Sequence, residues 1–98
     1  MKEIAADKLK HLIENKDDDF ILIDVREEWE RTNYSIGGIH IPLGELIIRQ
    51  LEIPKDKSVV LYCEKGIRST IAIQRLEALG FHNLYNLTGG LKAWKAAK

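Results

Sequence analysis

The sequence has few of the features that would specify a disulfide, a metal cluster or a membrane segment. Its 98 residues include one cysteine, Cys63, so a disulfide within the chain is impossible and no cysteine cluster is available to bind zinc. No apolar run approaches the roughly 20 residues that span a bilayer. The charged stretch 1–16 lacks the apolar core of a signal peptide. We therefore expect a cytoplasmic protein with no membrane segment.

The chain also lacks an excess of charge of either sign, because fifteen Lys and Arg residues balance fifteen Asp and Glu residues. A neutral chain has no general attraction to nucleic acid or to an anionic membrane, so we expect neither as a partner. The hydrophobic fraction, 45%, is that of an ordinary globular protein. Since no internal repeat or linker interrupts the pattern, we expect one domain over residues 1–98.

Strand-like and helix-like segments alternate along the chain. Two short runs rich in β-branched residues, 20–25 and 58–63, predict buried strands, and a third short strand is expected at 83–87. The spacing of apolar residues predicts helices, with a further helical turn, over 5–16, 27–31, 43–51, 67–79 and 91–97. This alternation predicts an α/β fold with a doubly wound, mostly parallel sheet that is flanked by helices on both faces.

Individual apolar side chains can be assigned to the expected core. Ile67 and Leu79 fall mostly on one stripe of the helix 67–79, so we expect that stripe to face the sheet. Trp29 and Trp94 are expected to pack in the core or at its edge.

Cys63 ends the second predicted strand and is followed closely by the helix 67–79, at the edge where open parallel sheets bind ligands. A tight turn there directs several backbone N–H groups toward one point, and the helix start adds unpaired N–H groups and a positive dipole end. Gly66 permits the unusual backbone angle of such a turn, and Lys65 and Arg68 add positive charge. Each feature alone also fits a buried structural cysteine and ordinary surface charges. Together they favour a thiolate, the nucleophilic form of cysteine.

Four motifs in this order resemble rhodanese-homology domains, and the resemblance extends from about residue 4 to residue 94. The motifs are Ile23-Asp24-Val25-Arg26-Glu27, Gly37-Gly38-Ile39-His40-Ile41-Pro42-Leu43, the loop from Cys63 to Arg68, and Gly80-Phe81-His82-Asn83-Leu84-Tyr85 running to Gly89-Gly90-Leu91-Lys92-Ala93-Trp94. Relatives often have Gly-His-Ile-Pro-Gly before the short strand, where this chain has a Tyr34–Gly38 segment without the His and Pro. That departure concerns the packing of a loop more than catalysis.

The resemblance implies a sulfurtransferase in which Cys63 carries sulfur as a persulfide. Its thiolate would attack the outer sulfur of an anionic donor, thiosulfate or a polysulfide, and the sulfur would pass to cyanide or a thiol. Backbone N–H groups of the loop would hold the persulfide, and Lys65 and Arg68 would bind the donor. No metal or organic cofactor is required. The residues expected to bind substrate are Glu64, Lys65, Gly66, Ile67, Arg68 and Ser69.

The length of the loop favours a sulfurtransferase over a phosphatase. Related dual-specificity phosphatases share the fold but place an arginine six positions after the cysteine, where this chain has Ser69; its arginine, Arg68, comes fifth. The shorter loop suits a sulfur atom better than a phosphoryl group. The loop also lacks the Gly and Ser/Thr positions of mercaptopyruvate-type enzymes.

Three charged residues lie outside the loop. Asp24 and Arg26 match the family's Asp-x-Arg pair, and we expect them to form a structural ion pair. Arg31 lies near the position of a second donor-binding arginine in some relatives, although a surface role is the simpler expectation. Alternatives to the enzyme are a sulfur-relay protein with thioredoxin-like or other protein partners, and an inactive docking module, which commonly lacks the cysteine.

Overall fold

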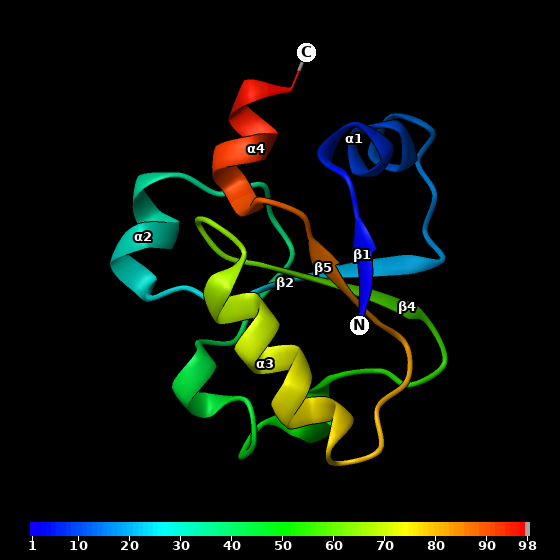
Figure 1. Ribbon diagram of the computed structural model, residues 1–98, viewed down its shortest axis with the longest axis vertical. Helices are drawn as coiled ribbons and strands as arrows, with labels where there is room; N and C mark the ends of the chain where they lie inside the picture. Colours follow the sequence, from blue (N-terminus) through cyan, green and yellow to red (C-terminus); the bar gives the residue numbers. More distant parts are fainter. Residues whose placement is uncertain (98) are drawn as a thin grey trace.

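The computed structural model describes residues 1–97 and confirms the α/β architecture (Figure 1). Lys98, the last residue of the predicted domain, lies outside the described residues. The elements in chain order are β1 (Lys2–Ile4), α1 (Ala6–Glu14), β2 (Phe20–Asp24), α2 (Glu28–Asn33), β3 (Ile39–His40), the 3₁₀ turns η1 (Leu43–Glu45) and η2 (Gln50–Glu52), β4 (Ser58–Tyr62), α3 (Ile67–Glu77), β5 (Leu84–Leu87) and α4 (Gly90–Ala96). Within residues 1–97, no helix has the length and apolar character needed to cross a membrane.

The five strands form one sheet in the order β1-β5-β4-β2-β3, and every pairing is parallel. β4 lies in the middle, where Leu61 pairs with Ile23 of β2 on one side and with Asn86 of β5 on the other. Parallel pairing brings the carboxyl ends of these three strands to one edge of the sheet. Whatever follows each strand in the sequence therefore meets at that edge.

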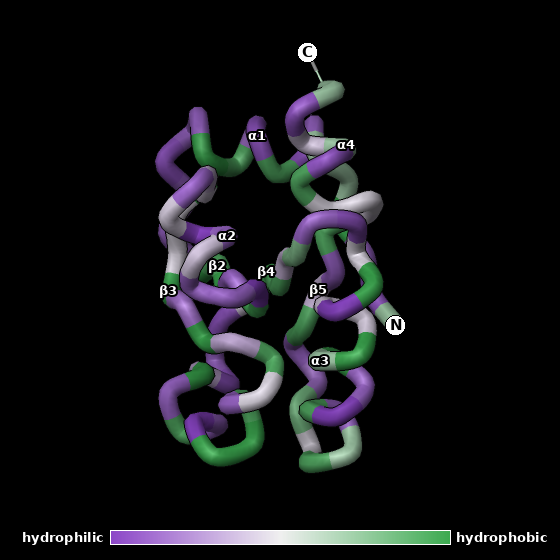
Figure 2. Tube along the Cα trace, turned by 90° about the vertical axis from the view of Figure 1, so that its left-hand side faces the viewer, coloured by the Kyte–Doolittle hydropathy of each residue, from purple (hydrophilic) through white to green (hydrophobic). Residues whose placement is uncertain are grey.

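The two faces of β4 contribute to two separate hydrophobic cores. Since successive side chains of a strand point to opposite faces, Val59, Leu61 and Cys63 pack on the side of α3, whereas Val60 and Tyr62 pack on the side of α1 and α4. Figures 1 and 2 show α1 and α4 together beyond one face of the strands and α3 beyond the other. This arrangement confirms the prediction of helices on both faces and explains why β4 is a continuous apolar run.

Two segments differ from the sequence-based prediction. β1 was not predicted, because three residues are too few for a periodic pattern and Ile4 also fits the spacing of the helix that follows. The helix predicted over 43–51 is wrong, since the chain forms only η1 and η2 with turns between them. Of its apolar residues Leu46 is fully buried, whereas Ile48 and Leu51 are exposed. A helix this short is stable only when several apolar side chains on one face pack against the rest of the protein, and here only Leu46 is fully buried.

Three apolar side chains predicted to pack in the core are exposed instead. Trp29 on α2 is 72% exposed, Ile67 at the start of α3 is 67% exposed, and Leu79 just after α3 is 42% exposed. Each lies at or beyond the end of a helix or on a helix too short to have an inner face. Helical spacing alone could not reveal that these positions extend past the edge of the sheet.

The start of α4 packs directly against the loop that follows β4. The backbone N–H of Leu91 donates to the carbonyl oxygen of Cys63, and that of Lys92 donates to the carbonyl oxygen of Glu64, both at 2.9 Å. Gly90 makes this close approach possible, because a Cβ atom there would lie 2.5 Å from the carbonyl oxygen of Cys63. The C-terminal helix thus fixes the backbone of the Cys63 loop through these two hydrogen bonds.

We expect Gly90→Ala to lower the free energy of unfolding by about 3 kcal/mol, since an added methyl group must displace backbone atoms that cannot move freely. The matched control is Gly80→Ala, where φ is +97° but no atom lies within 4 Å of the added Cβ. That control should lose only the cost of backbone strain, about 1–2 kcal/mol. Urea unfolding followed by circular dichroism measures both. Equal losses in the two variants would contradict the close-packing argument.

Candidate active site

Cys63 follows directly after the central strand β4 and precedes α3 by three residues, so it lies at the carboxyl edge of the sheet. The residue is 1% exposed. Its side chain nevertheless lines an open pocket, so the sulfur is recessed rather than enclosed. A recessed thiol at this edge has the location that open α/β sheets give to their ligand sites.

The sulfur of Cys63 accepts hydrogen bonds from the backbone of its own loop. The N–H of Gly66 donates to Sγ at 3.1 Å, and the N–H of Ser69 donates to it at 3.4 Å. Gly66 has φ +94° and is the residue before α3, so the chain turns there in a conformation that glycine adopts without strain. Two inward N–H groups and the first turn of a helix surround this sulfur, an arrangement that favours negative charge on it.

Ser69 connects the sulfur to a buried polar network that sequence reasoning missed. Its Oγ lies 3.4 Å from Cys63 Sγ and donates to Oδ1 of Asn86 on β5. The amide nitrogen of Asn86 in turn donates to Thr70 Oγ1 and Glu3 Oε1. The available signal was a polar residue inside the predicted strand 83–87, since asparagine is depleted in strands. At 4% exposure, Asn86 needs these partners to satisfy its side chain.

The pocket in front of Cys63 encloses about 360 Å³ and brings most of the predicted site residues together. Glu64, Lys65, Ile67 and Arg68 line it beside the cysteine, whereas Gly66 and Ser69 lie behind the sulfur as its N–H donors. Lys65 and Ile67 are exposed at its rim. The sixth lining residue, Glu30 of α2, was not among the predicted site residues.

Arg68 is joined to Glu30 by a two-pronged ion pair across this pocket. Its two terminal nitrogens donate to the two carboxylate oxygens of Glu30 at 2.6 and 2.8 Å. Glu30 is held from its own side as well, because the N–H of Glu27 donates to its Oε1 at 3.1 Å in a reciprocal helix cap. Glu30 holds the glutamate position of a capping box, but the N-cap residue is Glu27 where that pattern has Ser or Thr, so the sequence carried only half of the signal for a fixed carboxylate.

The ion pair shifts the titration of both partners. Hydrogen bonds from Arg68 lower the pKa of Glu30 from 4.5 to about 2, although partial burial opposes the shift. The same hydrogen bonds raise the pKa of Arg68. Both groups are therefore charged throughout the pH range in which a thiolate forms.

A second ion pair lies behind the site, at the end of β2. Arg26 donates to both carboxylate oxygens of Asp24, from Nε at 3.0 Å and from one terminal nitrogen at 2.9 Å, and both side chains are almost fully buried. Burial opposes the charge of Arg26, but the contacts with Asp24 raise its pKa above the ordinary value. Arg26 also donates to the carbonyl oxygen of Tyr34 at 2.6 Å, which ties the end of α2 to the strand.

Arg31 belongs to this second cluster and does not line the Cys63 pocket. It donates to Asp24 Oδ2 at 3.4 Å and to the carbonyl oxygen of Gly38 at 2.7 Å. The nearby loop, which lacks the His and Pro common in relatives, is held from the other side by Tyr62. That hydroxyl donates to the carbonyl oxygen of Gly37 at 2.7 Å and lies 3.1 Å from Ser35 Oγ.

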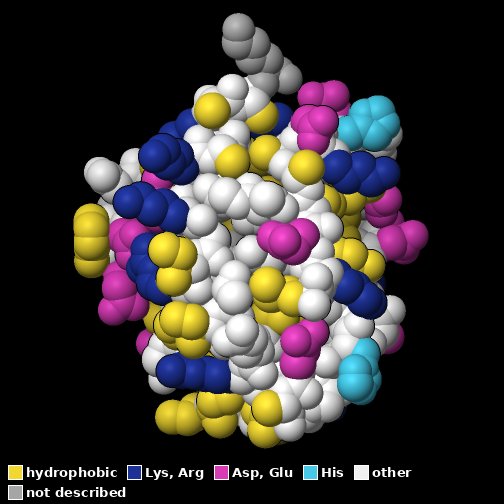
Figure 3. Space-filling model, viewed as in Figure 1, with side chains coloured by type: hydrophobic (Ala, Val, Ile, Leu, Met, Phe, Trp, Pro, Cys, Tyr) yellow, Lys and Arg dark blue, Asp and Glu magenta, His cyan; other side chains and the backbone are white. Residues whose placement is uncertain are grey.

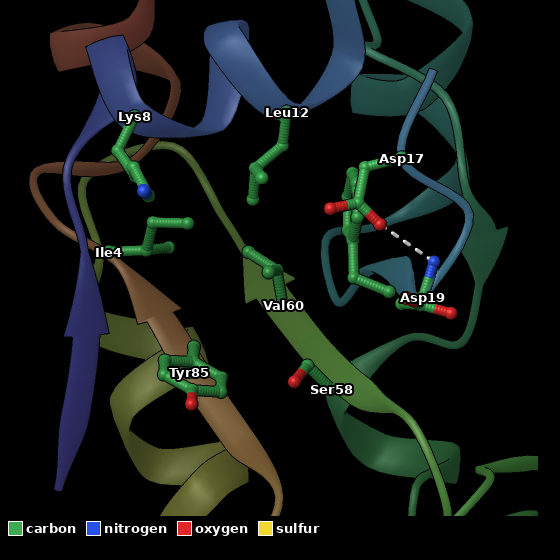
Figure 4. Close-up of a pocket in the computed structure, with 9 residues that line it drawn as sticks. Ile4, Lys8, Leu12, Asp17, Asp19, Ser58, Val60 and Tyr85 are labelled. Atoms are coloured by element: carbon green, nitrogen blue, oxygen red, sulfur yellow. Dashed lines mark hydrogen bonds between the residues drawn. The ribbon is translucent and has the colours of Figure 1, made fainter. Parts of the chain in front are cut away.

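Another pocket, of about 270 Å³, lies between α1 and the face of the sheet, toward the amino ends of β2 and β4 (Figure 4). Ile4, Leu12, Val60 and Tyr85 give it mostly apolar walls, and Ser58 marks the amino end of β4. Its described lining contains no cysteine and none of the predicted site residues.

The described residues thus form a parallel α/β sheet whose central strand leads directly into a cysteine that accepts loop N–H bonds. A family model described as "Rhodanese-like domain" matches residues 5–97 of this chain. The chain belongs to the rhodanese-like domain family, as its sequence motifs indicated. That family includes proteins named sulfurtransferases.

Individual relatives support the same placement. The chain is 46% identical over 74 residues to "Uncharacterized protein YqhL" of Bacillus subtilis, a match that covers 74% of this chain and 59% of that protein. It is 35% identical over 95 residues to a "Sulfurtransferase" of Allochromatium vinosum, covering 96% of this chain and 88% of the relative. A crystal structure of a rhodanese-related protein from Thermoplasma volcanium superposes with a TM-score of 0.86 at 31% identity, covering 98% and 92% of the two chains.

We expect the Glu30–Arg68 pair to make stability depend on acid pH. Because the pKa of Glu30 is lower in the folded state than its ordinary 4.5, its contribution is complete above that value and is lost as the pH falls toward 2. In Glu30→Gln the stability should fall less steeply between pH 4.5 and 2. Chemical unfolding at a series of pH values measures the slope. Glu28→Gln, which removes the same charge from the same helix, is the control, and an equal flattening there would refute the assignment.

Proposed function

We propose that this protein transfers sulfane sulfur from an anionic donor, thiosulfate or a polysulfide, to cyanide or a thiol through a persulfide on Cys63. The observation that carries the proposal is the position of the Cys63 sulfur, which accepts N–H bonds from Gly66 and Ser69 and lines an open pocket. Membership of a family that includes a relative named "Sulfurtransferase" supports it.

In the first half-reaction the Cys63 thiolate attacks the outer sulfur of the donor. With thiosulfate, a new S–S bond to Cys63 forms while the S–S bond of the donor breaks, and its electron pair leaves with sulfite. The negative charge then rests on the outer sulfur of the persulfide. The N–H groups around the sulfur stabilise anionic charge without having to reorganise, which is the largest single contribution that such sites make to catalysis.

In the second half-reaction an acceptor nucleophile attacks the outer sulfur of the persulfide. Cyanide leaves as thiocyanate, and the bond that breaks returns its electron pair to Cys63 as a thiolate. Each half-reaction forms one bond and breaks one, with every atom and electron pair accounted for, so this scheme needs no oxidant or reductant, and no metal or organic cofactor takes part in it. In this proposal Lys65 and Arg68 attract the donor, Glu64 and Ile67 form the walls that contact it, and Asp24 and Arg26 keep the adjacent strand end in place.

The alternatives are a phosphatase, an inactive docking module and a sulfur-relay protein. A phosphatase would need room for a phosphoryl group in the loop, and the spacing of five between Cys63 and Arg68 is one short of that class. An inactive docking module has no use for a cysteine held by N–H donors. A sulfur-relay protein shares the same chemistry but uses protein partners, of thioredoxin-like or other type. A cytoplasmic location and the extent of one domain over residues 1–98 remain predictions.

Incubation with thiosulfate should add one sulfur atom to the protein, measured as intact mass, and cyanide should remove it. Cys63→Ser should gain nothing, because the hydroxyl cannot form a persulfide. Ser69→Ala tests the surroundings of the sulfur without removing the nucleophile, and should still accept sulfur. The proposal fails if the wild-type protein acquires no sulfur from either thiosulfate or polysulfide while hydrolysing an aryl phosphate.

Arg68→Ala should raise the KM for thiosulfate roughly tenfold, since a hydrogen bond to a charged group contributes about 1.5–3 kcal/mol. The rate at which cyanide discharges a preformed persulfide should change much less, because that step has no sulfonate to bind. Stopped-flow measurement of each half-reaction separates the two effects. A variant that slows only the discharge would show that Arg68 acts on the persulfide and not on the donor.

A further inference from the structure

Two acidic and two basic side chains line the Cys63 pocket. Glu30, Glu64, Lys65 and Arg68 are all among the lining residues, so their formal charges cancel. Figure 3 shows the same mixture on the side of the molecule that carries α2, where Lys and Arg side chains lie beside Asp and Glu. The pocket therefore differs from the purely basic donor site that Lys65 and Arg68 suggest in the sequence.

The guanidinium of Arg68 is already occupied. A sulfonate is bound best by two parallel N–H bonds from one guanidinium edge, and Arg68 uses both terminal nitrogens on Glu30. A donor that requires Arg68 must displace Glu30 from one of these bonds or accept a weaker contact. In either case the carboxylate stays at the pocket and repels a negative donor.

Glu30 is held in place and does not readily move aside. Its side chain is 13% exposed, its Oε1 accepts the N–H of Glu27, and its carbonyl oxygen accepts a bond from Arg26 at 3.4 Å. With a pKa of about 2, it is ionised under all conditions in which Cys63 reacts. The negative charge at this point of the rim is thus a fixed part of the site.

We propose that Glu30 is a specificity-determining residue, which disfavours doubly charged sulfur donors relative to singly charged donors of the same shape. It does so by neutralising Arg68 and by repelling each negative charge on the donor, so a dianion is penalised about twice as much as a monoanion. The inference rests on the proposed sulfur transfer and deepens it. It assigns to the site a preference for singly charged donors such as hydropolysulfides over thiosulfate.

Two donors of similar geometry and different charge isolate this effect. Thiosulfate is a dianion and leaves as sulfite, whereas methanethiosulfonate is a monoanion and leaves as methanesulfinate. In both reactions the Cys63 thiolate forms a bond to the outer sulfur, the bond between that sulfur and the sulfonyl sulfur breaks, and its electron pair stays on the leaving group. A change in their relative rates therefore reports charge at the donor site.

The test measures sulfur uptake in single turnovers, by intact mass, over a range of concentrations of each donor. Glu30→Gln removes the charge, and glutamine at this position keeps the helix cap, so the fold should be retained. We expect the ratio of thiosulfate to methanethiosulfonate efficiency to rise about tenfold, through the concentration dependence rather than the maximal rate, as expected for removal of one nearby charge. Glu30→Ala should shift the ratio in the same direction.

Two further variants define the mechanism. Glu28→Gln removes an equal charge from the same turn of α2 without touching Arg68, and it should leave the ratio unchanged. In the double variant Glu30→Gln with Arg68→Ala, most of the gain should disappear, because the freed guanidinium is no longer present. Comparison of the single and double variants shows how much of the gain comes from freeing the Arg68 guanidinium and how much from removing the repulsion between Glu30 and the donor.

The outcomes are distinguishable. An unchanged donor ratio in Glu30→Gln would overturn the inference. An equal loss of efficiency with both donors would also overturn it, because it would mean that Glu30 only positions Arg68. A rise in Glu28→Gln as large as that in Glu30→Gln would also overturn it. If the wild-type protein takes sulfur from neither donor, the proposed function itself fails, whereas sulfur uptake with no effect of Glu30 leaves the function intact.

Discussion

The parallel register of β2, β4 and β5 is the constraint on which the rest of the molecule depends. Because Ile23, Leu61 and Asn86 lie side by side in the sheet, the chain that follows each strand leaves it at the same edge. Asp24 with its arginine partners, the Cys63 loop and the start of α4 are thereby brought together from distant parts of the sequence. A slip of one residue would turn every side chain of β4 to the opposite core and move Cys63 away from its N–H donors.

Buried polar groups at this edge are matched one by one, and that matching gives the loop its shape. Asp24 and Arg26 neutralise each other, and Ser69 and Asn86 satisfy one another behind the sulfur. Left unpaired, a buried charge would cost several kcal/mol and a buried hydroxyl or amide about 1–3 kcal/mol. These matched hydrogen bonds hold the loop in one arrangement, and N–H groups that already point at the sulfur need little reorganisation when it becomes charged.

Much of this could be predicted from the sequence, and the failures have common physical causes. The strands at 20–24 and 58–62 and the helix from Ile67 were predictable because each is long enough to show its period and has apolar side chains facing the core. β1 was not predictable, because its three residues are too few to show a period. The segment from η1 to η2 has the apolar spacing of a helix, but no neighbouring surface buries that apolar face, so no helix forms. The motif around Cys63 predicted a sulfur surrounded by loop N–H groups between strand and helix, because the turn chemistry is local. The pairing of Arg68 with Glu30 joins residues 38 positions apart, and no local pattern encodes which partner a surface-like charge selects.

That pairing changes how the electrostatics of the site should be understood. If Lys65 and Arg68 were free, formal positive charge would stabilise both the bound donor and the sulfur anion, and the two effects could not be separated. With Arg68 neutralised by a fixed carboxylate, the main stabilisation of the sulfur comes from neutral N–H dipoles that point at it. Dipoles of this kind act over a short range, so they stabilise a charge on the sulfur and contribute little to attracting a distant anion. In the proposed reaction the two tasks therefore fall to different groups: the backbone from Gly66 to Ser69 would hold the transferred sulfur, and the balance between Arg68 and Glu30 would determine which donors reach it.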